Sequence, residues 1–163
     1  MKVLFLDHDG VICLSSEWGS RFKNKEGLDS VFDRFNEKAI KILNEIIELT
    51  DCEIVISSDW RFHATLSQMQ ELYRLRGIKK SPIAYTRNDL DWKLFKGVHP
   101  GTELEVTRCL EIEAWIEEHP EITHWVAVDD MDLSALKNFV RTPRSNEGIK
   151  QSGIKEKIIQ FLK

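Results

Sequence analysis

Hydrophobic residues gather in short, nearly unbroken runs that alternate with longer segments in which they recur at helical spacing. Nearly unbroken apolar runs are typical of strands that are buried on both faces of a parallel sheet. They predict strands at residues 3–6, 52–56 and 125–128, with shorter strands at 82–86 and 139–140.

The segments between these strands have apolar residues three or four positions apart, which predicts helices. The first helix is expected to begin at Ser30 and to carry Phe35, Leu43 and Leu49 on its apolar face. Further helices are expected at residues 64–75, from Thr107 to the residue before Pro120, and from Ser152 onward. Strands that alternate with helices imply an α/β fold, here a three-layer, Rossmann-like parallel sheet with helices on both faces.

Two segments lack a clear periodicity. Residues 10–28 are expected to form a loop or flap over the end of the first strand, and residues 87–105, with Gly97 and Pro100, an irregular loop near the same edge. The chain has 163 residues, 42% of them hydrophobic, which is enough for one core. We therefore expect a single domain over residues 1–163 with no large cap domain.

Composition narrows the possible partners and location. The net charge of −4 provides no general attraction to nucleic acid or to an anionic membrane. No apolar stretch is long enough to cross a bilayer, and the N-terminus shows no cleavable signal pattern. The three cysteines are widely spaced and form no CxxC pair, which is typical of reduced thiols. A cytoplasmic protein without membrane association is the expectation.

Polar residues stand directly after three of the predicted strands. Asp7 and Asp9 follow the first strand, Ser57 follows the second, and Asp129 and Asp130 end the strand at 125–128. Because the carboxyl ends of parallel strands meet at one edge of the sheet, these side chains should converge on one crevice. Crowded carboxylates repel each other unless a cation is shared, and oxygen ligands suit Mg²⁺. A carboxylate can also act as a nucleophile towards phosphorus.

The same three strand ends resemble the motifs of the haloacid dehalogenase (HAD) superfamily. Residues 5–11, Phe-Leu-Asp-His-Asp-Gly-Val, resemble its motif I, an Asp-x-Asp-Gly-Val sequence after a hydrophobic strand. Residues 54–57, Ile-Val-Ile-Ser, resemble motif II, and residues 125–130, Trp-Val-Ala-Val-Asp-Asp, resemble motif IV. The three motifs occur in the family's order and span almost the whole chain.

The resemblance implies a role for each residue. Asp7 would be the nucleophile, and Asp9 the general acid and base. Ser57 would bind the phosphoryl group of the substrate. Asp7, the backbone carbonyl of Asp9 and Asp129 would hold Mg²⁺, assisted by Asp130 directly or through water.

The family's motif III is less regular here. The superfamily usually places a lysine near the start of the helix that precedes the motif IV strand, and in this chain Arg108 is expected to take that position and to bind the phosphoryl group. A guanidinium pairs with phosphate and carboxylate bidentately. Lys93 and Lys96 are the rivals. Residues 57–61 and 108–121 resemble a compact subgroup of HAD proteins that includes the HAD domains of RNA-repair proteins.

The resemblance implies a Mg²⁺-dependent phosphatase, and an Asp at position 9 favours phosphatase over dehalogenase chemistry. The expected substrate is a phosphorylated small molecule or the phosphate end of a nucleic acid. A receiver-like phosphoacceptor, an Asp-x-Asp nucleotide-sugar transferase and a catalytically silent HAD-fold binding protein are the alternatives. The oligomeric state is left open.

Residues beside these motifs have structural interpretations as well. Trp60 is expected in the core, and Arg61 is expected to brace the site by pairing with an acid. Asp59 and Asp132 are expected to cap the elements that follow them. His8 is expected either to pack behind the acids or to tune specificity.

Overall fold

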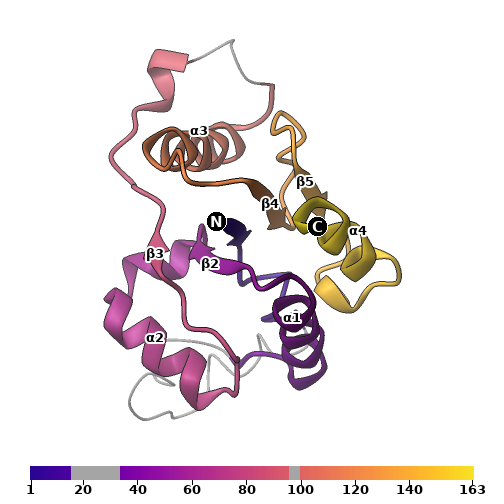
Figure 1. Ribbon diagram of the computed structural model, residues 1–163. Coiled ribbons are helices and arrows are strands. Elements are labelled where there is room, and N and C mark those ends of the chain that lie inside the picture. Colours follow the sequence, from indigo (N-terminus) through magenta and orange to yellow (C-terminus); the bar gives the residue numbers. More distant parts are fainter. Residues whose placement is uncertain (16–33, 96–99) are drawn as a thin grey trace.

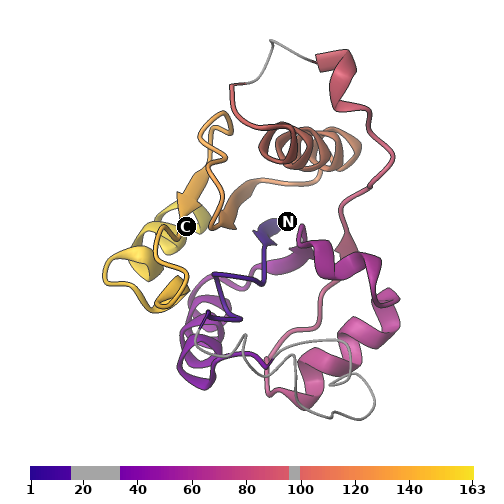
Figure 2. The same ribbon diagram turned by 180° about the vertical axis from the view of Figure 1, so that it is seen from behind.

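The computed structural model describes residues 1–15, 34–95 and 100–163, which form a parallel sheet between helices (Figures 1 and 2). The five strands lie in the order β3-β2-β1-β4-β5, and each neighbouring pair is parallel. They are β1 (Lys2–Leu6), β2 (Glu53–Ile56), β3 (Ala84–Tyr85), β4 (His124–Asp129) and β5 (Phe139–Arg141). The predicted Rossmann-like α/β fold is confirmed.

Helices cover both faces of this sheet. One face carries α1 (Glu37–Thr50), α2 (Leu66–Leu75) and α4 (Ile154–Leu162), and the other carries α3 (Glu103–Glu118). Figure 1 shows α3 above the sheet and α1 and α2 below it. Short 3-10 helices lie in the connections: η3 (Asp59–Phe62), η4 (Trp92–Phe95) and η5 (Gly148–Lys150).

The register of the sheet places three strand ends side by side. Leu6, the last residue of β1, pairs with Ile56 of β2 and with Val128 of β4. The ladder continues for one residue, because the Asp7 N–H donates to the Val128 carbonyl and the Ser57 N–H donates to the Leu6 carbonyl, both at 3.1 Å. The residues that follow Leu6, Ile56 and Val128 therefore start from one level of the sheet.

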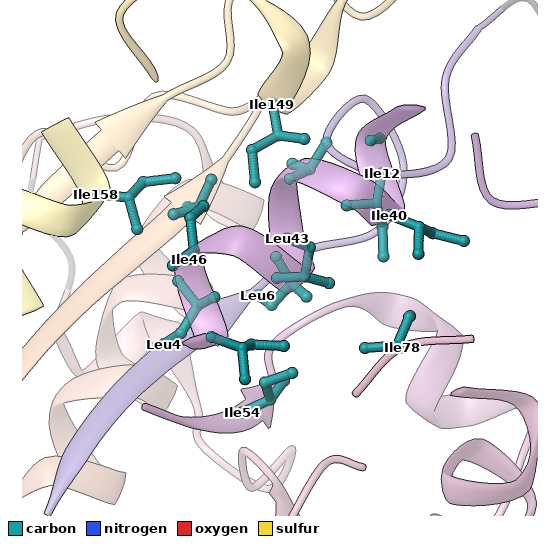
Figure 3. Close-up of a cluster of buried hydrophobic side chains, with 14 of the residues drawn as sticks. Leu4, Leu6, Ile12, Ile40, Leu43, Ile46, Ile54, Ile78, Ile149 and Ile158 are labelled. Atoms are coloured by element: carbon teal, nitrogen blue, oxygen red, sulfur yellow. The ribbon is translucent and has the colours of Figure 1, made fainter. Parts of the chain in front are cut away.

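The alternation of side chains along β1 explains its unbroken apolar run. Leu4 and Leu6 point into the core under α1, while Val3 and Phe5 point into the core under α3, and all four are fully buried. Figure 3 shows the first of these cores, where Leu43 and Ile46 of α1 lie over Leu4 and Leu6. In the second core the ring of Phe5 meets Trp115 of α3 edge to face, with 5.6 Å between ring centroids.

The helices α1 and α3 begin several residues from their predicted starts. The N-cap of α1 is Asn36, whose side chain accepts from the N–H groups of Lys38 and Ala39. Residues 34–36 are not helical, so the prediction of a helix through Phe35 was wrong, and Ser30 lies outside the described residues. The helix predicted from Thr107 begins earlier, at Glu103.

The start of α3 also shortens the loop predicted at residues 87–105. Thr102 caps α3 in a capping box with Glu105, each side chain bonding the other residue's backbone N–H. Within the described part of that segment, residues 92–95 form η4. The predicted flap at residues 10–28 lies largely in residues 16–33, outside the described residues.

The C-terminal part differs less from the prediction. Gly153 rather than Ser152 is the N-cap of α4. The segment after Asp132 is a turn instead of a helix, although Asp132 does accept from the Ser134 N–H at 3.0 Å, as expected of a cap.

The described connections contain no second folded unit. The described residues between β1 and β2 form a turn and α1, and those between β2 and β4 form η3, α2, β3, η4 and α3. All three cysteines are buried free thiols. None of the described helices combines the length and the apolar character that crossing a membrane requires.

We expect Leu43→Ala to lower the free energy of unfolding by about 2–5 kcal/mol, because it empties part of a fully buried site. Leu49→Ala on the same helix is the control, since Leu49 is 62% exposed, and it should change stability by less than about 0.5 kcal/mol. Urea denaturation followed by circular dichroism measures both. Equal losses would show that α1 does not pack on the sheet as described.

Candidate functional site

Three polar residues stand at the carboxyl edge of the sheet. Asp7, Ser57 and Asp129 belong to or follow three adjacent strands, and their exposed fractions are only 4%, 1% and 1%. Asp130 comes next and is half-buried. The expectation that these distant segments converge on one site is therefore met by the arrangement of β2, β1 and β4.

The carboxylates of Asp7, Asp129 and Asp130 form a tight cluster. Each offers an oxygen that lies within 4.8 Å of an oxygen of the other two. Burial and then the charge of Asp129 raise the pKa of Asp7 well above its ordinary value, although Arg108 acts in the opposite direction. Burial and Asp129 likewise raise the pKa of Asp130 to about 6. The cluster thus holds more negative charge than its surroundings favour.

Arg108 supplies positive charge to this cluster from α3. Its Nη1 donates to Oδ2 of Asp129 at 2.8 Å and lies 3.4 Å from Oδ1 of Asp7. Its Nη2 donates to Oδ1 of Asp59 at 2.9 Å. Burial opposes the charge of Arg108, but Asp7 and Asp129 outweigh burial and raise its pKa above the ordinary value. Arg108 is therefore a fixed cation between the nucleophile candidate and the acids of β4.

Of the two rival cations, Lys93 alone lies within the described residues. Lys93 lies in η4 with its side chain exposed, and Lys96 lies outside the described residues. In the described structure it is Arg108 that forms ion pairs with both Asp7 and Asp129.

Like the Arg108–Asp59 pair, a second ion pair links α3 to η3. Nη2 of Arg61 in η3 donates to Oε2 of Glu111 in α3 at 2.7 Å, and both side chains are 4% exposed. Nη1 of Arg61 donates to the Ser57 carbonyl at 2.9 Å. Arg61 therefore connects α3 to the residue that follows β2. The expectation that Arg61 pairs with an acid is confirmed.

The turn after β1 depends on a glycine. Gly10 has φ 75°, and a Cβ built on it would lie 2.6 Å from Oδ2 of Asp130. Its N–H donates to the Cys13 carbonyl at 2.8 Å, and its own carbonyl accepts from Oγ1 of Thr142 at 2.9 Å. These bonds hold the half-buried Asp9 at the opening of the turn.

His8 points away from the acids into the core under α1. Its Nε2 lies 2.6 Å from the Tyr73 hydroxyl, and its ring meets Trp60 edge to face at 4.6 Å between centroids. Burial, and then the charge of Arg108, lowers the pKa of His8 to about 3. A neutral, packed imidazole agrees with the packing interpretation, and Trp60 is a core residue as expected.

The cluster of three acids has the donor chemistry of a magnesium site. Carboxylate oxygens are the ligands that Mg²⁺ prefers. A cation among them would offset both the burial and the mutual repulsion that raise the pKa values of Asp7 and Asp130. The side chain of Asp9 is not part of the cluster. The part expected to bind metal was its backbone carbonyl.

Sequence reasoning missed three supporting residues. Asp59 was expected only as a cap, but Ser58 is the N-cap of η3 and Asp59 pairs with Arg108 instead. Neither Glu111 nor Thr142 was given a partner. A signal for the first two was present, because Asp59-x-Arg61 and Arg108-x-x-Glu111 carry opposite charges that can pair crosswise. Nothing in the sequence pointed to Thr142.

Comparison with protein families gives a match over most of the chain. A family described as the HAD domain in Swiss Army Knife RNA repair proteins matches residues 3–152. No curated protein and no solved structure matches the chain. The matched region contains the acid cluster, Arg108 and the Arg61–Glu111 pair. Since it also covers most of the sequence, the chain belongs to this family of HAD domains.

Proposed function

We propose that this chain is a Mg²⁺-dependent phosphatase that hydrolyses phosphomonoesters through an aspartyl-phosphate on Asp7. The observation that carries the proposal is the contact of buried Arg108 with both Asp7 and Asp129. It places a carboxylate beside a fixed positive charge at the edge of a parallel sheet, where ligands bind. Membership of a HAD family supports a phosphatase-type hydrolase.

Asp7, Asp129 and Asp130 are the proposed protein ligands of Mg²⁺, together with the carbonyl of Asp9. When bound, Mg²⁺ supplies positive charge that offsets the negative charge of the phosphoryl oxygens. The three carboxylates must be deprotonated to bind it, so the raised pKa values of Asp7 and Asp130 make metal binding stronger as pH rises.

The reaction takes place in two displacements. A carboxylate oxygen of Asp7 attacks phosphorus, the ester P–O bond breaks, and Asp9 donates a proton to the leaving oxygen. A water molecule then attacks the phosphorus of the aspartyl-phosphate while Asp9 accepts its proton. The P–O bond to Asp7 breaks, so phosphate leaves and the Asp7 carboxylate is restored.

Ser57 and Arg108 are the proposed binding residues for the phosphoryl group. The backbone of Ser57 is held on both sides, by Leu6 and by Arg61, so its hydroxyl starts from a fixed position. Arg108 is held by Asp59 and Asp129, and a guanidinium held in this way needs little reorganisation when a phosphoryl group arrives.

A phosphate end of a nucleic acid is the proposed substrate class. The description of the family, which refers to RNA repair proteins, supports this choice. The described connections contain no cap domain that would enclose a small substrate. Since the net charge is −4, attraction to the nucleic acid would come from local groups such as Arg108.

We expect hydrolysis of an aryl phosphate and of 3′- or 5′-phosphorylated oligonucleotides that requires Mg²⁺ and is abolished by EDTA. Asp7→Asn should lower kcat by about 10⁴-fold or more, and Asp9→Asn by about 10²–10⁴-fold. Phosphate release and acid-quench trapping of the phosphorylated protein measure both steps.

Activity retained in Asp7→Asn would contradict the mechanism. Stable phosphorylation of Asp7 without phosphate release would identify a phosphoacceptor, and binding of phosphorylated ligands with no chemistry would identify a catalytically silent protein.

Arg108→Ala should lower kcat/KM by about 10²–10³-fold, because it removes the cation beside the reacting phosphoryl group. Arg108→Lys keeps the charge but cannot reach Asp7, Asp129 and Asp59 with one planar group. Its kcat/KM should therefore lie between those of Arg108→Ala and the wild-type chain. Lys93→Ala, which removes an exposed cation, should have the same kcat/KM as the wild-type chain. A large loss in Lys93→Ala with a small loss in Arg108→Ala would reverse the assignment. Thermal unfolding confirms that each variant is folded.

Gly10→Ala should weaken Mg²⁺ binding by about 10- to 100-fold, because the added methyl group displaces the side chain of Asp130. Gly77→Ala is the matched control, since Gly77 also has φ 75° but has open space where its Cβ would lie. Both variants should lose about 1–2 kcal/mol of stability from the left-handed backbone. Calorimetric Mg²⁺ titration separates the two effects, and equal affinities would refute the role of Asp130.

A further inference from the structure

A small pocket adjoins the acid cluster, between η3 and α3. Its volume is ≈ 140 Å³. Phe62 from the end of η3, Leu104 from the first turn of α3 and Met131, which follows the acids of β4, form its apolar lining. Three segments far apart in the sequence thus contribute apolar side chains to one hollow.

The pocket shares its walls with the candidate active site. Arg108 lines the pocket and also contacts Asp7. Asp59 lines it and pairs with Arg108, while the Met131 N–H donates to Oδ1 of Asp129 at 2.9 Å. A phosphoryl group bound at Asp7 and Arg108 is therefore a neighbour of this pocket, which shares Arg108 with the candidate active site.

The charged residues that line the pocket neutralise one another. Arg61 pairs with Glu111 at 2.7 Å, and Arg108 pairs with Asp59 at 2.9 Å. A second anionic group in the pocket would compete with Asp59 and Glu111 for these cations, and loss of the Arg61 pair would leave the buried Glu111 carboxylate without its cation. A neutral group can enter without disturbing either pair.

The apolar residues at the rim indicate the shape of that neutral group. Phe62 and Leu104 come from different elements but line the same pocket, and they are 54% and 65% exposed, so their apolar surfaces are open to a ligand. The guanidinium of Arg61 lies 4.8 Å from the centre of the Phe62 ring, which helps to orient it. The volume is close to the cavity of about 150 Å³ that accepts one benzene molecule in another protein.

We propose that this pocket binds one neutral aromatic ring carried by the leaving group of the phosphomonoester. The ring lies against Phe62 and Leu104 while the phosphate is held at Arg108. The proposal rests on the proposed phosphatase function and adds a specificity subsite to it. A phenyl group and a pyrimidine base both have the required size and neutral charge.

Two pairs of substrates test the pocket and distinguish these sources. Benzyl phosphate is compared with ethyl phosphate, and uridine 5′-phosphate with ribose 5-phosphate, because the leaving oxygens within each pair are chemically similar. In the unchanged chain the aromatic member of at least one pair should have the higher kcat/KM. Phe62→Ala and Leu104→Ala should each lower that ratio by about 5- to 100-fold. Leu75→Ala, which removes a 57% exposed leucine outside the pocket, is the control and should keep the ratio.

The result for each pair has a definite meaning. A Phe62-dependent ratio for the uridine pair identifies a nucleobase as the occupant, and one for the benzyl pair alone identifies a ring close to the phosphate. Ratios that do not change in either variant overturn the proposal.

Binding separates this proposal from the phosphatase function itself. Titration calorimetry of Asp7→Asn with benzylphosphonate and ethylphosphonate needs no turnover. If the chain hydrolyses nothing, the proposed function fails, and a Phe62-dependent preference for benzylphosphonate still supports the pocket. Equal affinities for the two phosphonates, unchanged by Phe62→Ala, overturn the pocket even when hydrolysis is observed.

Discussion

The ion pairs of the buried Arg108 guanidinium hold the candidate site together. Asp7 and Asp129 end adjacent parallel strands, so the fold itself forces two carboxylates together with little water to separate them. Burial and then the charge of Asp129 raise the pKa of Asp7, and Arg108 in α3 opposes that rise. The ion pairs to Asp7, Asp129 and Asp59 also connect α3 to the sheet edge.

Buried ion pairs seldom add much net stability, because removing two charges from water costs several kcal/mol per ion. Here they hold site residues in position. Arg61 of η3 bonds both Glu111 of α3 and the carbonyl of Ser57. Arg108 of α3 bonds Asp59 of η3, so both proposed phosphoryl-binding residues are tied to η3. Because the two pairs also neutralise the walls of the adjoining pocket, one set of contacts bears on both the proposed chemistry and the proposed choice of leaving group.

Predictions of helix starts failed where several capping residues compete. Thr102 and Glu105 form the capping box of α3, a local signal that outweighs Thr107, whose hydroxyl instead donates to the Glu103 carbonyl inside the helix. At α1 the aromatic spacing extended the predicted helix through Phe35, but Phe35 packs flat against Trp60 before the helix begins at Glu37. Tertiary packing of one aromatic ring therefore overrode helical periodicity.

Local patterns in the chain were enough to predict the strands, their parallel arrangement and the convergence of Asp7, Ser57 and Asp129, because unbroken apolar runs and the polar residues after them can be recognised without any contact between segments. Which charges pair depends on how distant segments pack together. Arg61 and Glu111 are 50 residues apart, and Thr142 holds the Gly10 carbonyl from 132 residues away. The need for a glycine beside Asp130 also became visible only when the two segments were placed together. Periodicity reports which face of an element is buried, whereas pairing depends on the register and distance between elements, which are set by the packed core.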